Sequence, residues 1–161
     1  SYEVLKGIKI LSQELKQVDY IFIIKPHPNL EISKHLLLLG LDKLPTNIII
    51  SNDDIDNLLD SCLFTIFMST AAAYNAVINA NIVLNLRSEL NLSDNYLDIF
   101  KKEFKFINSY SLDSIKNILL EFKKDEKNIK KYKDEFDRLK NYLIDGMNAI
   151  NEVNLDKFIR N

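Results

Sequence analysis

The chain has 161 residues, enough for one ordinary domain, and its 47% hydrophobic and 27% charged residues exclude a disordered segment. Twenty-one basic and 23 acidic residues leave a formal net charge of −2, which argues against a nucleic-acid-binding protein, because such binding needs clustered excess Lys and Arg. No apolar run is long enough to span a bilayer, and the single cysteine, Cys62, is typical of a reducing compartment. We expect a cytoplasmic piece of a longer protein, at most peripheral to the inner face of the cell membrane.

Helix and strand patterns alternate along almost the whole chain. Amphipathic spacing predicts the helices, and short continuous apolar runs predict the strands. In chain order the predicted elements are a helix at 2–16, a strand at 20–24, a helix at 30–39 ended by Gly40, a strand at 48–51, a helix at 53–61 capped by Asn52 or Asp53, a strand at 63–68, a helix at 70–80, a strand at 82–86, a polar loop at 87–95 and a strand at 104–107. Beyond Tyr110 we expect only helices: one capped by Ser111 or Asp113 and running to Lys124, one at 126–144, and a last one after Gly146.

Strand–helix–strand units of this length predict a parallel sheet with right-handed crossovers. We therefore expect a doubly wound, Rossmann-like α/β domain with a sheet of about five strands over residues 1–110. Residues 111–161 are expected to form a helical C-terminal extension of the same domain.

In open α/β sheets, ligands bind beyond the carboxyl ends of the strands, so polar residues that directly follow strands are the candidates for a site. Lys25 and His27 follow the first predicted strand, and each is followed by a proline, Pro26 or Pro28. The two prolines hold the backbone in an extended form. A preordered cation and imidazole suit an anionic, oxygen-rich ligand. A rigid surface turn without a ligand explains the same residues, and the sequence leaves both interpretations open.

The second candidate is Ser69-Thr70, which follows the third predicted strand and opens a helix that begins with three alanines. Hydroxyl residues at a helix start leave backbone N–H groups free for a phosphate, although an ordinary N-cap explains them equally well. We expect His27, Ser69 and Thr70 to converge on one pocket. The sequence contains no zinc pattern, no Gly-rich phosphate loop and no dinucleotide fingerprint, so we expect neither a metal site nor a bound cofactor.

An apolar strand ending in Lys-Pro-His-Pro, followed about 40 residues later by an apolar strand ending in Ser-Thr, resembles the C-terminal half of GT-B glycosyltransferases. The similarity covers residues 20–86. The closest resemblance is to bacterial enzymes of surface-polysaccharide synthesis: sialyltransferases, polysialyltransferases and glycerophosphotransferases of capsule, lipooligosaccharide and teichoic-acid assembly. The resemblance implies that this chain is the half that binds the nucleotide-sugar donor.

The resemblance also implies roles for individual residues. His27 and Pro28 would line the nucleotide site, with His27 catalytic, while Ser69 and Thr70 would hold the phosphate. Lys25 would add charge nearby. Many UDP-sugar enzymes of this family place a glutamate about five residues beyond the Ser-Thr pair, whereas this chain has Asn75 there, which favours a CMP- or CDP-linked donor.

Catalysis in this family is metal-independent, and the general base normally comes from the N-terminal, acceptor-binding domain. The resemblance therefore implies that this chain alone binds donor weakly and transfers no sugar. Three alternatives stay open: half of a UDP-sugar epimerase, half of a CDP-polyol phosphotransferase, and a non-catalytic α/β binding module.

Overall fold

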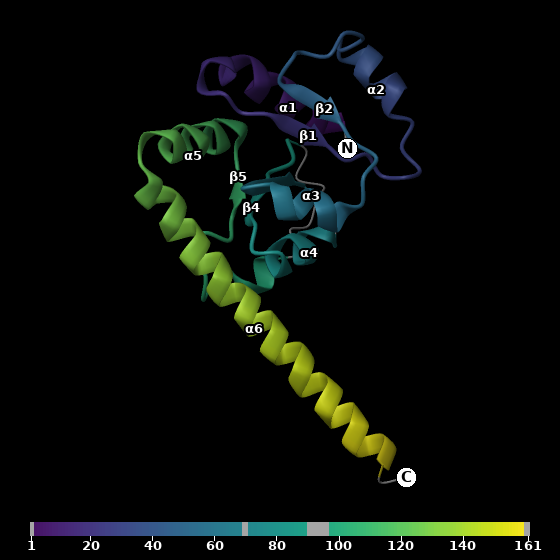
Figure 1. Ribbon diagram of the computed structural model, residues 1–161, viewed down its shortest axis with the longest axis vertical. Helices are drawn as coiled ribbons and strands as arrows, with labels where there is room; N and C mark the ends of the chain where they lie inside the picture. Colours follow the sequence, from purple (N-terminus) through teal and green to yellow (C-terminus); the bar gives the residue numbers. More distant parts are fainter. Residues whose placement is uncertain (1, 69–70, 90–96, 160–161) are drawn as a thin grey trace.

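The computed structural model describes residues 2–68, 71–89 and 97–159, with side chains described up to residue 146. The chain is an α/β protein in which strands and helices alternate before two C-terminal helices follow (Figure 1). The elements are α1 (Tyr2–Glu14), the 3-10 helix η1 (Lys16–Val18), β1 (Phe22–Ile24), α2 (Ile32–Leu38), β2 (Ile48–Ile50), α3 (Ile55–Ser61), β3 (Phe64–Phe67), α4 (Ala72–Ile78), β4 (Ile82–Leu86), the 3-10 helix η2 (Asp98–Phe100), β5 (Ser109–Tyr110), α5 (Leu112–Lys124) and α6 (Glu126–Ile159).

The strands form two small parallel sheets. β1 pairs with β2 in one sheet, and β3, β4 and β5 lie in that order in the other. The parallel arrangement that the sequence predicts is therefore confirmed, but the single sheet of about five strands is wrong. The reason is that alternation of strands and helices predicts parallel neighbours without saying whether successive pairs share one ladder.

Aromatic side chains pack where the two sheets meet. The ring of Tyr20, just before β1, lies edge to face with the ring of Phe64, at the start of β3, with 5.6 Å between their centroids. The Tyr20 hydroxyl also donates to the Leu119 carbonyl oxygen of α5 at 2.8 Å. One buried side chain thus contacts the first sheet, the second sheet and α5.

The two sheets differ in how well their faces are covered. All five residues of β4 are buried, as expected for a central strand of a parallel sheet. In the first sheet, Phe22 and Ile48 are buried whereas the neighbouring Ile23 and Ile49 are 36% and 47% exposed. One face of the first sheet is therefore open to solvent.

The strand predicted at 104–107 is wrong. Residues 104 and 107 are buried, but the segment consists of turns, and β5 begins only at Ser109. Side chains satisfy its backbone: the Phe106 N–H donates to Glu135 Oε1 at 2.6 Å, and the Tyr110 hydroxyl donates to the Phe106 carbonyl oxygen at 2.8 Å. The apolar residues of this segment belong to the core without forming a ladder.

The predicted cap of one helix and the glycine after another are confirmed, whereas the predicted cap of a third helix is wrong. Ser111 caps α5, its hydroxyl accepting from the Ser114 N–H at 3.1 Å, and Gly40 follows α2 with a left-handed φ of 64°. The N-cap of α3 is Asp54, not Asn52 or Asp53, and its side chain makes no capping hydrogen bond. Asp53 instead accepts from the Ser51 hydroxyl at 2.8 Å.

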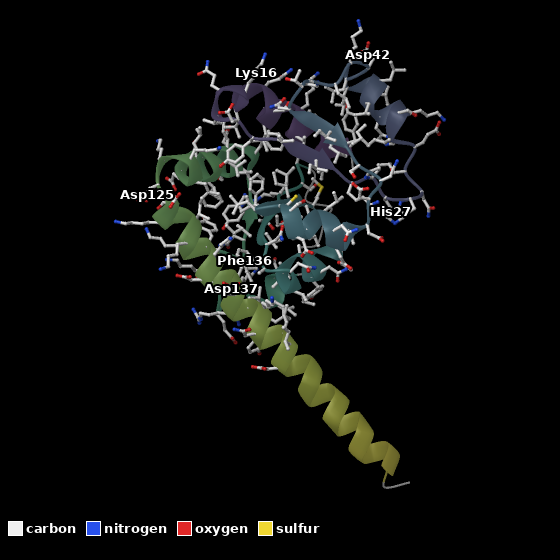
Figure 2. All side chains as sticks on the ribbon, viewed as in Figure 1. Lys16, His27, Asp42, Asp125, Phe136 and Asp137 are labelled. Carbon is white, nitrogen blue, oxygen red and sulfur yellow. The ribbon has the colours of Figure 1, made fainter. Side chains whose placement is uncertain are left out.

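The last helix, α6, is continuous over 34 residues, so the break predicted at Gly146 is wrong. Its first half packs against α4, α5 and β4, burying Phe136 and Leu139, and its second half projects from the body (Figures 1 and 2). Within the described residues, no helix is both long enough and apolar enough to cross a membrane.

Candidate functional site

The carboxyl edge of the first sheet carries the side chains that the sequence singles out. Ile24 of β1 is paired with Ile50 of β2, so Lys25 and Ser51 leave the sheet side by side. Lys25 is exposed, and its Nζ donates to the carbonyl oxygen of Asn52 at 3.0 Å. The register of two short parallel strands therefore places a cation at this edge.

His27 lies in a tight turn directly beyond β1, exposed at the rim of the molecule (Figure 2). The Leu30 N–H donates to the His27 carbonyl oxygen at 2.8 Å, and the Asn29 N–H donates to His27 Nδ1 at 3.2 Å. Because a backbone N–H can only donate, Nδ1 is the acceptor, and the neutral ring carries its proton on Nε2. The turn thus orients the imidazole and leaves an N–H donor on its far side.

This edge also contains a carboxylate. The carboxylate of Asp53 accepts from the Ser51 hydroxyl at 2.8 Å, and the Asp53 N–H donates back to the same hydroxyl at 3.1 Å. Asp53 follows β2 by three residues, so both signs of charge occur among the residues that follow the two strands. An anionic ligand here needs a further cation or neutral donors such as the His27 Nε2–H.

The positions of the other predicted site residues say less about a ligand. Pro28 is exposed beside His27, and Asn75 is exposed on α4. Ser69 and Thr70 lie outside the described residues, so their convergence with His27 remains a prediction. α4 begins at Ala72 and has only seven residues, which gives little macrodipole to assist a phosphate at its start.

The carboxyl edge of the second sheet contains polar residues that were not expected. Asn85 is only 3% exposed, in an otherwise apolar strand. Its Nδ2 donates to the Met68 carbonyl oxygen at the end of β3, and its Oδ1 accepts from the Ser109 hydroxyl of β5, both at 2.6 Å. Arg87 follows β4 directly and is exposed. A single amide inside an apolar run and an arginine directly after it are the sequence signals for these residues.

A surface hollow of about 390 Å³ lies at the opposite, amino edge of the first sheet, where Ser12, Lys16 and Asn47 line it. Two of its polar side chains have partners: the Ser12 hydroxyl donates to the Lys9 carbonyl oxygen at 2.8 Å, and Asn47 Nδ2 donates to the Ser12 carbonyl oxygen at 2.9 Å. The lining residues that the structure describes include no histidine, whereas the carboxyl edge combines the exposed Lys25 with the oriented imidazole of His27, so the carboxyl edge offers the better chemistry for a ligand. In the part of the chain that the structure describes, no three His, Cys, Asp or Glu side chains are grouped to hold a metal ion.

No known protein family, no curated protein and no solved structure matches this chain. The residues at the strand ends are therefore the features that indicate a function.

Proposed function

We propose that this chain is the donor-binding half of a metal-independent, GT-B-like glycosyltransferase that uses a CMP-linked sugar in the synthesis of a bacterial surface polysaccharide. Its two parallel sheets would then belong to one doubly wound, Rossmann-like domain. Support comes from the parallel α/β architecture and from the Lys-Pro-His-Pro segment at the carboxyl edge of the first sheet, where such folds bind ligands.

The orientation of His27 carries the proposal. Its Nδ1 accepts from the Asn29 N–H, so Nε2 carries a proton both in this neutral tautomer and in the imidazolium form. The ring therefore offers an Nε2–H donor to a ligand. A preoriented donor of this kind stabilises the charge that develops on a departing nucleotide phosphate.

The other proposed roles follow from this one. Lys25 would exchange the Asn52 carbonyl oxygen for a phosphate oxygen, Pro28 would line the nucleotide, and Ser69 and Thr70 would add hydroxyl donors. The exposed Asn75, which lacks a carboxylate, favours a CMP- or CDP-linked donor over a UDP-linked one. A separate acceptor-binding domain would supply the general base in a cytoplasmic enzyme, and the 161-residue chain alone would transfer no sugar.

Calorimetric titration of the 161-residue chain with CMP, CDP and UDP tests the proposal. We expect binding that favours CMP and that weakens about tenfold in His27→Ala, because a hydrogen bond to a charged group is lost. His35→Ala is the matched control, since His35 lies on α2 with its Nδ1 3.1 Å from the Glu31 carbonyl oxygen, away from the strand ends. A preference for UDP would favour the epimerase alternative, and no binding of any nucleotide would leave only a non-catalytic module.

A further inference from the structure

Arg87 is held at the carboxyl edge of the second sheet by two contacts with β5. Its backbone N–H donates to the Tyr110 carbonyl oxygen at 2.8 Å, and its Nη2 donates to the Ser109 carbonyl oxygen at 2.9 Å. β4 is the middle strand of this sheet, and its residue Asn85 is paired with Phe67 of β3. Arg87 therefore lies at the level where the chain leaves β3.

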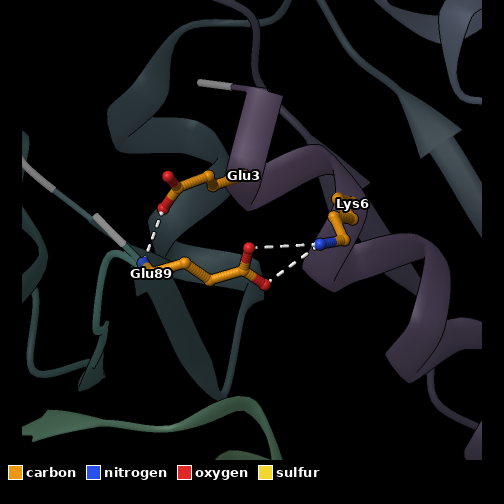
Figure 3. A network of polar contacts seen from close by, with 3 residues as sticks. All are labelled: Glu3, Lys6 and Glu89. Carbon is orange, nitrogen blue, oxygen red and sulfur yellow. Dashed lines mark hydrogen bonds and ion pairs between the residues drawn. The ribbon is translucent and has the colours of Figure 1, made fainter. Parts of the chain in front are cut away.

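The charge of Arg87 is not compensated by a carboxylate in the described part of the chain. Glu89, two residues further on, is occupied by Lys6, whose Nζ lies 3.0 and 3.2 Å from the two carboxylate oxygens (Figure 3). The carboxylate of Glu3 accepts from the Glu89 N–H at 3.1 Å. The acidic side chains described beside this loop thus have other partners, and no carboxylate among the described residues pairs with Arg87.

The guanidinium also has donors to spare. An arginine side chain has five N–H donors in a planar fork, and within the described residues only the Ser109 carbonyl oxygen accepts from the Arg87 guanidinium. An anchored guanidinium loses little conformational entropy on binding, and its fork matches two oxygens of a phosphate.

We propose that Arg87 binds the phosphate of the nucleotide, adding a guanidinium to the positive charge that Lys25 brings at the carboxyl edge of the first sheet. A carboxylate, that of Asp53, lies on the loop that follows β2 at the edge of Lys25, whereas none pairs with Arg87 among the described residues. This inference rests on the proposed function. It concerns the same nucleotide and assigns the recognition of its phosphate to Arg87. Arg87 acts as a binding residue, and its selectivity is for phosphate rather than for the base or sugar.

Titration of the 161-residue chain with cytidine, CMP and CDP separates phosphate recognition from the rest of the ligand. We expect Arg87→Gln to weaken CMP about tenfold and CDP at least as much, with cytidine unchanged, because only the phosphate contact is lost. Arg87→Lys keeps the charge without the fork, so it should recover part of the CMP affinity. Arg138→Gln is the matched control, since that guanidinium lies 5.5 Å from the Phe104 ring centroid and away from the strand ends.

The outcomes separate the two proposals. If the wild-type chain binds CMP and His27→Ala weakens it while Arg87→Gln does not, the inference about Arg87 is wrong and the proposed function stands. If Arg87→Gln weakens cytidine as much as CMP, its role is structural, and the inference is again overturned. If the wild-type chain binds none of the three probes, the proposed function fails and takes this inference with it.

Discussion

Asn85 is the residue whose burial is hardest to explain by packing alone. Apolar side chains fill the other four positions of β4, yet this amide is nearly inaccessible to solvent. Its two hydrogen bonds join it to the residue after β3 on one side and to β5 on the other. β3 ends and β5 begins at this level of the sheet. A buried amide satisfied in this way fixes the positions of neighbouring strands, because breaking it leaves buried polar groups without partners.

Asn85→Leu tests this role. The substitution keeps a similar shape but leaves the Met68 carbonyl oxygen and the Ser109 hydroxyl unpaired, so we expect the free energy of unfolding to fall by about 2 kcal/mol. Urea denaturation measures the change. The exposed Asn57→Leu on α3 is the control and should stay within about 0.5 kcal/mol of wild type. An Asn85→Leu chain as stable as wild type would mean that Asn85 does not tie the strands together.

At the scale of elements, the glycines differ in what their backbones require. Gly40 follows α2 at a φ of 64°, where any other residue is strained, whereas Gly146 lies inside α6 with no atom within 4 Å of the place a Cβ would occupy. Glycine is therefore required by the backbone conformation at position 40, whereas at position 146 it only lowers the stability of the helix.

The paired substitutions Gly40→Ala and Gly146→Ala should have opposite signs. We expect Gly40→Ala to lower the free energy of unfolding by about 1–2 kcal/mol, because alanine is forced into a left-handed conformation. Gly146→Ala should increase the helical circular dichroism and stabilise α6 by about 0.5–1 kcal/mol. A loss of helicity in Gly146→Ala would instead indicate that the helix is interrupted there.

Sequence patterns predict elements better than they predict partners. The strand at 82–86 was expected with the bounds it has, because its continuous apolar run is local information. The strand expected at 104–107 does not form. Glu135, which is distant in sequence, accepts a hydrogen bond from the Phe106 N–H that would otherwise pair with a neighbouring strand. Likewise, two prolines mark the Lys25 and His27 edge in the sequence, while the anchoring of Arg87 depends on the pairing of β4 with β5, which no local pattern contains.

In the molecule as a whole, Tyr20 connects the first sheet with the second sheet and with α5. Burial raises the pKa of its hydroxyl to about 12, while the hydroxyl donates to α5 and the ring contacts β3. Burial also raises the pKa values of Tyr110 and Tyr132 in the contact between β5 and α6. The protonated phenols are therefore favoured in the folded chain.

Alkaline pH should weaken these junctions. A folded-state pKa above the unfolded value of about 10 gives stability that is complete below pH 10 and is lost as pH rises towards 12. We expect the free energy of unfolding to fall over this range, and less steeply in Tyr20→Phe, which has one buried phenol fewer. At pH 7, the same variant should be about 1 kcal/mol less stable, because the hydrogen bond to Leu119 is lost. Urea denaturation at pH 7, 10 and 11 measures both effects, and identical pH slopes for the two chains would contradict this role of Tyr20.

The proposed function requires that a nucleotide binds at the carboxyl edge of the first sheet. Mapping of backbone amide NMR shifts during titration of the 161-residue chain with CMP tests it most directly. We expect the largest shifts at Lys25, His27 and Asn29. Shifts centred on Ser12, Lys16 and Asn47 at the amino edge, or no shifts at all, would contradict it.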